Sequence, residues 1–169
     1  MFLRFFLLPF SFLYDLITSI RNYQFDTGHR KSVTFEIPVV SVGNLTVGGT
    51  GKTPHVYLIA KLLKEVFFKN PGIVSRGYGR RSTGFVLAST NCKSTDLGDE
   101  PLQLYKALNE EVPVAVCEER ILGIPCLLQE EAEVDVIILD DAFQHRKVNP
   151  KLNILLSDYN REGSCSYSS

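Results

Sequence analysis

Short apolar runs alternate with amphipathic segments along the middle of the chain. Aliphatic and β-branched runs predict strands over residues 39–42, 72–75, 85–87, 114–116, 134–139 and 152–156. Between them, apolar residues spaced three and four apart predict helices over 53–66, 101–109 and 119–131, although Gly123 and Pro125 weaken the last one. Strands that are apolar throughout and alternate with helices are typical of a parallel sheet covered on both faces. The pattern therefore predicts an α/β fold.

The first 24 residues follow a different pattern, in which Phe and Leu dominate. The polar side chains fall within one narrow sector of a helix, and they are Arg4, Ser11, Asp15, Thr18 and Asn22. This thin polar stripe favours a helix that lies in the membrane interface, with the basic residues Arg21, Arg30 and Lys31 near anionic head groups. A membrane span, a cleaved signal peptide and a helix packed on the protein's own core are the alternatives.

Composition narrows the class of protein. The 169 residues suit one domain with an appendage, and 44% hydrophobic and 22% charged residues indicate a folded chain rather than a disordered one. The net charge of -1 gives no basic field, so we expect no nucleic-acid partner. The four cysteines form no C-x-x-C pair, which argues against a zinc knuckle and fits reduced thiols in a cytosolic chain.

The strongest chemical signal is a glycine-rich segment between a predicted strand and a predicted helix, Gly48-Gly49-Thr50-Gly51-Lys52-Thr53. Glycines let backbone N–H groups approach phosphate oxygens, Lys52 supplies a positive charge, and the Thr53 hydroxyl suits Mg²⁺. The strict phosphate-loop pattern has Gly where this chain has Thr46, and a plain glycine-rich turn is the alternative. The context favours a P-loop NTPase-like fold that binds ATP and Mg²⁺.

Two carboxylates, Asp140 and Asp141, follow the predicted strand 134–139. Ligands of open parallel sheets bind outside the carboxyl ends of the strands, so we expect this pair beside the phosphate loop, where it would hold Mg²⁺. A solvated acidic turn is the alternative. Asp99 precedes a predicted helix and is a candidate general base for an attacking hydroxyl, whereas helix capping by Glu100 would explain the same segment without catalysis.

Basic side chains near strand ends are candidates for contact with phosphate or substrate. The loop Arg76-Gly77-Tyr78-Gly79-Arg80 follows a predicted strand, and its Arg76, Tyr78 and Arg80 would bind substrate or nucleotide. An ordinary surface turn is the alternative. Arg120 would neutralise charge on the transferring phosphoryl group, or would otherwise be a solvent-exposed charge on a helix.

In this order, the motifs together resemble the tetraacyldisaccharide 4'-kinases of lipid A biosynthesis over roughly residues 3 to 160. The resemblance rests on the Phe/Leu-rich start and on four segments: Val42 to Pro54, Ser75-Arg76-Gly77-Tyr78-Gly79-Arg80, Gly98-Asp99-Glu100-Pro101 and Leu139-Asp140-Asp141-Ala142-Phe143-Gln144-His145-Arg146. Thr46 belongs to this family's own version of the loop. The phosphate loop alone occurs in many families, whereas the joint set is specific.

The resemblance implies transfer of the γ-phosphoryl group of ATP to the 4'-hydroxyl of a membrane-embedded lipid disaccharide, tetraacyldisaccharide 1-phosphate. It implies an enzyme on the cytoplasmic face of the bacterial inner membrane, in contact with membrane lipids. It makes Asp99 the catalytic base, Lys52 and Thr53 the phosphate and Mg²⁺ ligands, and Asp140 with Asp141 the carboxylates of the metal site.

We accordingly expect a membrane-associating helix over 1–24, an incomplete kinase domain over 25–160 and a frayed tail over 161–169. Family members continue into a second lobe that supplies a histidine partner for the catalytic aspartate, and no His follows His145 here. We therefore expect nucleotide binding with weak or absent turnover. The alternatives are a membrane-associated ATPase of the deviant phosphate-loop class, whose signature lysine is replaced by Val47, and a non-catalytic nucleotide-binding chain.

Overall fold

A computed structural model describes residues 32–44, 51–140 and 147–157 of the chain. The chain divides into two compact units, 1–33 and 34–169, and the description below concerns the second unit. The predicted membrane-associating helix, loop residues 45–50, Asp141 and the predicted tail lie outside the described residues. Within the described part of the chain, no helix combines the length and the apolar character that crossing a membrane requires.

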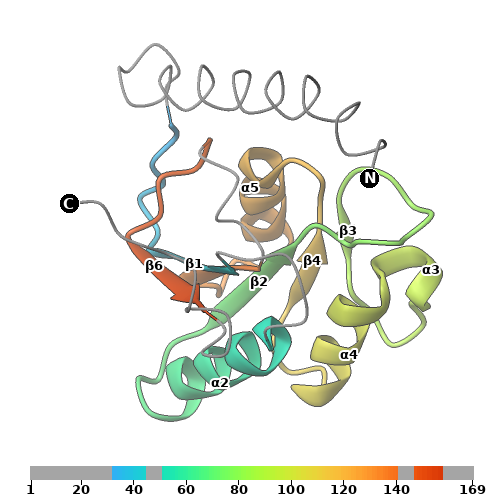
Figure 1. The fold of residues 1–169 in the computed structure, drawn as a ribbon, viewed down its shortest axis with the longest axis horizontal. Coiled ribbons are helices and arrows are strands. Elements are labelled where there is room, and N and C mark those ends of the chain that lie inside the picture. Colours follow the sequence, from blue (N-terminus) through green and yellow to red (C-terminus); the bar gives the residue numbers. More distant parts are fainter. Residues whose placement is uncertain (1–31, 45–50, 141–146, 158–169) are drawn as a thin grey trace, which may run out of the picture. The chain divides into compact units, whose positions relative to one another are not determined.

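The described strands form one six-stranded sheet in the order β3-β4-β2-β5-β1-β6 (Figure 1). The strands are β1 (Val39–Asn44), β2 (Pro71–Ser75), β3 (Val86–Leu87), β4 (Val114–Val116), β5 (Val136–Asp140) and β6 (Leu152–Leu156). All neighbouring pairs are parallel except β3 with β4, which is antiparallel. The predicted parallel sheet is thus confirmed. The edge strand β3, which the apolar pattern predicted at 85–87, pairs in the antiparallel direction, which the pattern did not indicate.

Helices cover both faces of the sheet, as the apolar pattern predicted (Figure 1). The helices are α2 (Lys52–Glu65), α3 (Ser94–Leu97), α4 (Asp99–Ala107) and α5 (Arg120–Glu130). On one face, α2 and α4 bury Val56, Ala60 and Leu104 against the strands. On the other face, α5 buries Ile124 and Leu127. Each fully buried aliphatic side chain of this kind contributes roughly 1.5–3 kcal/mol.

Gly123 explains why α5 forms although its helix was predicted only weakly. A Cβ at this position would lie 2.9 Å from the Cβ of Cys117 and 3.1 Å from Cγ1 of Val74. The missing side chain therefore lets the helix lie close to β2 and β4, and tertiary packing outweighs the low helix propensity of glycine. Pro125 also lies inside this helix.

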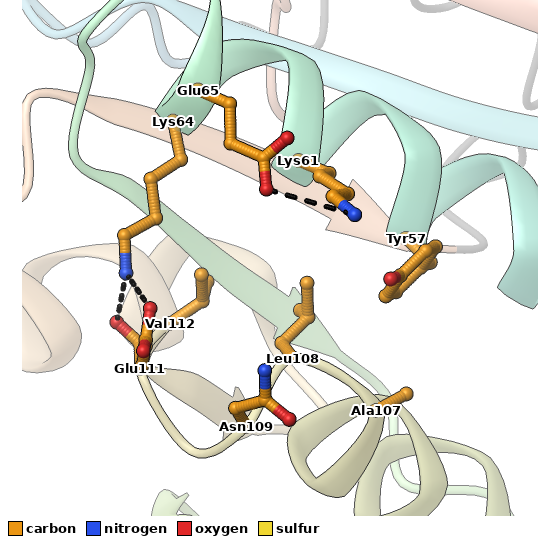
Figure 2. Close-up of a pocket in the computed structure, with 9 residues that line it drawn as sticks. All are labelled: Tyr57, Lys61, Lys64, Glu65, Ala107, Leu108, Asn109, Glu111 and Val112. Atoms are coloured by element: carbon orange, nitrogen blue, oxygen red, sulfur yellow. Dashed lines mark hydrogen bonds and ion pairs between the residues drawn. The ribbon is translucent and has the colours of Figure 1, made fainter.

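A small groove lies between α2 and the turn from α4 to β4, at the end of the sheet where the parallel strands begin (Figure 2). Its lining residues are Tyr57, Lys61, Lys64, Glu65, Ala107, Leu108, Asn109, Glu111 and Val112. Lys64 crosses the groove and donates to the Glu111 carboxylate at 2.6 Å. This exposed ion pair ties the end of α2 to the turn before β4.

Candidate functional site

The predicted site residues that the structure describes gather at the edge of the sheet where the parallel strands end, which we call the carboxyl edge. Asn44, Ser75, Val116 and Asp140 are the last residues of β1, β2, β4 and β5. Val42 of β1 pairs with Asp140 of β5, so the chain enters loop 45–50 directly beside the end of β5. This is the position at which open parallel sheets bind their ligands.

The amino end of α2 combines a glycine N-cap with a basic first turn. Gly51 is the N-cap, with a φ of +74° that favours glycine, and no side chain caps the helix. The first turn contains no acidic residue and begins with Lys52 and Thr53, both partly exposed. Pro54 is tolerated because N–H groups of the first turn have no helical partner. A helix start with a basic residue and the positive end of the helix dipole suits an anion such as phosphate.

Asp140 is a buried carboxylate on the same side of the sheet as α2. Side chains alternate along a strand, and Ile138 of β5 packs in the core shared with α2, so the Asp140 side chain faces that side too. Its carboxylate accepts a hydrogen bond from the Ser75 hydroxyl at 3.0 Å. The solvated acidic turn is therefore wrong for Asp140, which is 5% exposed. Asp141 lies outside the described residues.

Arg120, the first residue of α5, is buried rather than a solvent-exposed helix charge. Its guanidinium donates to the backbone carbonyl of Asp140 at 3.2 Å and to that of Glu118 at 3.3 Å. The side chain thus joins the carboxyl ends of β4 and β5. Its predicted role in neutralising phosphoryl charge stays a prediction.

The loop Arg76-Gly77-Tyr78-Gly79-Arg80 follows β2, and we call it the arginine-glycine loop. It packs against the amino end of α4. A Cβ on Gly98 would lie 2.7 Å from the Tyr78 carbonyl oxygen, and a Cβ on Gly77 would lie 2.9 Å from that of Leu97. The Arg81 N–H donates to the Thr95 carbonyl at 2.8 Å. Only glycine permits this close approach, which brings the loop next to Asp99, a pair of segments that the sequence did not link.

Within this loop, the predicted ligands separate into exposed and buried side chains. Arg76 is exposed, and Tyr78 is 90% exposed. Arg80 instead has a side chain only 3% exposed, which pairs with the Glu118 carboxylate and donates to the Gly84 carbonyl at 2.7 Å. The surroundings of Arg80 therefore give it a structural role, and its contact with substrate stays a prediction.

Glu118 completes this arrangement, which we call the Arg80–Glu118 clip. Its carboxylate also accepts the Gly84 N–H at 3.0 Å. Burial alone would raise the pKa of Glu118, but hydrogen bonds from its own N–H, from Arg80 and from Gly84, together with the Arg80 charge, lower it. The clip fastens the loop to the end of β4.

Asp99 is the first residue of α4 and is exposed. The N-cap of this helix is Gly98, so Glu100 is not the cap, and Pro101 occupies the third helical position rather than the first. An acidic side chain in the first turn interacts favourably with the helix dipole. This structural role is compatible with the predicted role of Asp99 as a base.

Sequence reasoning missed Ser75 and Glu118. Ser75 is a polar residue at the end of an apolar strand and directly precedes the arginine-glycine loop, so its position was a usable signal. Glu118 had no comparable signal, because its partner Arg80 lies 38 residues away. Across residues 32–44, 51–140 and 147–157, no three His, Cys, Asp or Glu side chains gather in a way that could hold a metal ion.

Comparison with known proteins identifies the family of the chain. The family model described as tetraacyldisaccharide-1-P 4'-kinase, LpxK, matches residues 3–165. The chain belongs to this family. The tetraacyldisaccharide 4'-kinase of Cytophaga hutchinsonii is 49% identical over 94% of this chain and 44% of that protein. The same-named protein of Bacteroides thetaiotaomicron is 46% identical over 92% and 40%.

The fold also matches a solved structure of the LpxK family. The crystal structure of LpxK from Aquifex aeolicus in complex with ATP superimposes with a TM-score of 0.81 and 44% sequence identity. The match covers 90% of this chain and 48% of that protein. The chain therefore spans less than half the length of the relatives it matches.

Proposed function

We propose that this chain binds ATP with Mg²⁺ at the carboxyl edge and contributes this half of the site to a lipid kinase. The reaction is transfer of the γ-phosphoryl group of ATP to the 4'-hydroxyl of tetraacyldisaccharide 1-phosphate. The observation that carries the proposal is the placement of Asp140 on the side of the sheet covered by α2, beside the strand end that leads to the glycine-rich loop. Family membership and the ATP complex of a relative support it.

The residues at this edge fit a nucleotide and its cation. The glycine-rich residues Gly48, Gly49, Thr50 and Gly51 would surround the phosphates, and Lys52 would bind them as a point charge. The Thr53 hydroxyl and the Asp140 carboxylate are hard oxygen donors of the kind that Mg²⁺ prefers, and Asp141 is the further candidate. When bound, Mg²⁺ would neutralise phosphate charge.

We assign the chemical roles as follows. Asp99 accepts the proton of the attacking 4'-hydroxyl. The oxygen of that hydroxyl bonds to the γ-phosphorus, and the bond from this phosphorus to the oxygen that bridges it to the β-phosphate breaks, which releases ADP. Lys52 offsets the negative charge on the phosphates, and Arg120 is the second candidate for offsetting this charge. The exposed side chains of Arg76 and Tyr78 contact the substrate, and the Arg80–Glu118 clip holds them in place.

The same proposal places the protein at the cytoplasmic face of the bacterial inner membrane. Its support is the apolar pattern of residues 1–24 and the lipid disaccharide in the names of the relatives. Flotation with anionic vesicles tests it: the full chain should float with the vesicles. A chain beginning at residue 34 should stay in the dense fraction, and flotation of both would place the lipid contact elsewhere.

Two measurements test the kinase proposal. Isothermal titration with ATP should show binding that strengthens when Mg²⁺ is added, and a radiolabelled assay with tetraacyldisaccharide 1-phosphate should show labelled lipid. Failure to bind ATP overturns the proposal.

A non-catalytic nucleotide-binding chain is the second candidate. ATP binding without any lipid labelling at high protein concentration would support this candidate. ATP hydrolysis that rises with dimerisation would instead support a deviant phosphate-loop ATPase.

A further inference from the structure

Ser75 is a buried hydroxyl at the carboxyl edge that the proposed function does not yet use. It is the last residue of β2 and is 5% exposed. Its hydroxyl donates to Oδ2 of Asp140 at 3.0 Å, and both groups are buried. A hydrogen bond between a neutral hydroxyl and a carboxylate is stronger than one between two neutral groups.

The strand register fixes this contact. β2 pairs with β5 in parallel, with Val74 opposite Leu139, so the next residues, Ser75 and Asp140, stand side by side. Both side chains point to the side covered by α2, because Ile73 and Ile138, two residues earlier, lie in the core on that side. The bond therefore links two neighbouring strand ends on the side where we place the nucleotide.

A carboxylate needs such a partner to hold one orientation. The last torsion of an Asp side chain is broad, so the backbone alone does not fix which oxygen faces a ligand. Ser75 engages Oδ2 and thereby restricts the rotation of the group. Groups that orient a metal-binding carboxylate typically change metal affinity by about 10- to 100-fold when they are removed.

We infer that Ser75 is a positioning residue, which orients the Asp140 carboxylate for the Mg²⁺ that accompanies ATP. This inference rests on the proposed function and extends it to a residue of β2. It predicts that loss of the Ser75 hydroxyl weakens the contribution of Mg²⁺ to ATP affinity. The affinity for ATP in the absence of Mg²⁺ stays the same.

The test compares ATP affinity in MgCl2 with ATP affinity in EDTA by isothermal titration of the full chain. In Ser75→Ala, the gain that Mg²⁺ gives should fall about 10-fold relative to wild type. Ser75→Thr keeps the hydroxyl and should restore most of the gain. Ser75→Cys keeps a side chain of similar size with a weak donor and should behave like Ser75→Ala.

Ser41→Ala is the matched control. Ser41 is also a buried strand serine, but it belongs to β1 and faces the opposite side of the sheet, with Val39. Its replacement removes a hydroxyl of equal size and should leave the Mg²⁺ gain within about 2-fold of wild type. Thermal unfolding of each variant shows whether a change in affinity reflects loss of the fold.

The outcomes separate this inference from the proposed function. If wild type gains no ATP affinity from Mg²⁺, the proposed nucleotide site is wrong. If wild type gains affinity and Ser75→Ala keeps the whole gain, Ser75 has only a structural role and the inference is overturned. Equal losses in MgCl2 and in EDTA, or equal losses in Ser75→Ala and Ser41→Ala, also overturn it.

Discussion

Helices α2 and α4 begin with the same backbone pattern and opposite charge. Each has a glycine N-cap with positive φ, Gly51 at +74° and Gly98 at +92°, and each has proline at the third helical position. Between glycine and proline, α2 has Lys52-Thr53 and α4 has Asp99-Glu100. Both helices start at the carboxyl edge and run back along the same side of the sheet (Figure 1).

The difference lies in what surrounds each glycine. Among the described residues, the nearest atom to a Cβ on Gly51 would be in the His55 ring, at 3.9 Å. A Cβ on Gly98 would collide with the Tyr78 carbonyl, so the arginine-glycine loop packs directly against the start of α4. A basic helix start suits a phosphate, whereas a packed, acidic one suits a carboxylate held in a fixed place. Similar backbone thus supports two chemical tasks.

Replacing each glycine with alanine should give the largest contrast between the two helix starts. Gly98→Ala combines a backbone conformation that is almost restricted to glycine with a contact to a carbonyl, and should cost about 3 kcal/mol of unfolding free energy. Gly51→Ala adopts a milder left-handed conformation, with no described atom closer than 3.9 Å to the added Cβ, and should cost about 1 kcal/mol. Chemical denaturation measures both.

Gly79→Ala is the control for the conformational part of this effect. Its φ is +79° and nothing lies within 4 Å of the added Cβ. It should therefore resemble Gly51→Ala. Equal costs for Gly98→Ala and Gly79→Ala would mean that the packing of the loop against α4 contributes nothing.

Sequence pattern predicted the central strands well because burial on both faces leaves a continuous apolar run. Strand β4 begins and ends where the pattern put it, at 114–116. The edge strand β6 also lies where the pattern put it, at 152–156, although its side chains are exposed or half-buried. The start of α4 was misplaced because proline at the first position and at the third give the same pattern, and the glycine N-cap is visible only in its φ. The antiparallel pairing of β3 involves only two residue pairs, which are too few to give a repeating pattern in the sequence.

For the candidate site, the motifs indicated which strand and helix ends carry the chemistry, and the structure groups the described ones at one edge. The motifs did not indicate which of these side chains pair with other residues of the chain. Arg80 and Arg76 look alike in sequence, yet one is paired with Glu118 and the other is exposed. Such long-range pairing depends on how the loop packs, and the local spacing of apolar and polar residues carries no information about it.

Lys52→Ala should give the next largest effect, on binding rather than on folding. Loss of a charge-assisted contact to phosphate should weaken ATP affinity by about 2 kcal/mol, or roughly 30-fold. Titration calorimetry measures it. Lys61→Ala, at an exposed lysine of the same helix that pairs only weakly with Glu65, is the matched control and should change affinity less than 2-fold or so. An equal loss in both variants would point to general electrostatics instead of a phosphate site.

Asp99→Asn should separate the acidic helix start from the basic one. The substitution removes a charge that favours the helix dipole, so unfolding free energy should fall by about 0.5 kcal/mol. ATP affinity should stay within about 2-fold of wild type, because the proposed nucleotide contacts belong to α2 and β5. Any lipid labelling in the kinase assay should disappear. A marked fall in ATP affinity would show that the two helix starts serve one ligand.

Glu118→Gln should give the smallest effect and the one that depends most on pH. The pKa of Glu118 is lowered in the folded chain from its ordinary value of 4.5, so its stabilising effect is complete above that pH and is lost as the pH falls through the lowered pKa. Wild type should therefore melt at a higher temperature than Glu118→Gln at pH 7, and the difference should shrink below pH 4.5. Trypsin should also cut the variant faster after Arg80 and Arg81.

Glu111→Gln, which breaks the exposed Lys64–Glu111 pair, is the control, because the pKa of Glu111 is also lowered, by the hydrogen bond from Lys64. It should show the same trend in melting temperature without faster cleavage in the loop, and equal cleavage of both variants would show that the Arg80–Glu118 clip does not hold the loop beside α4.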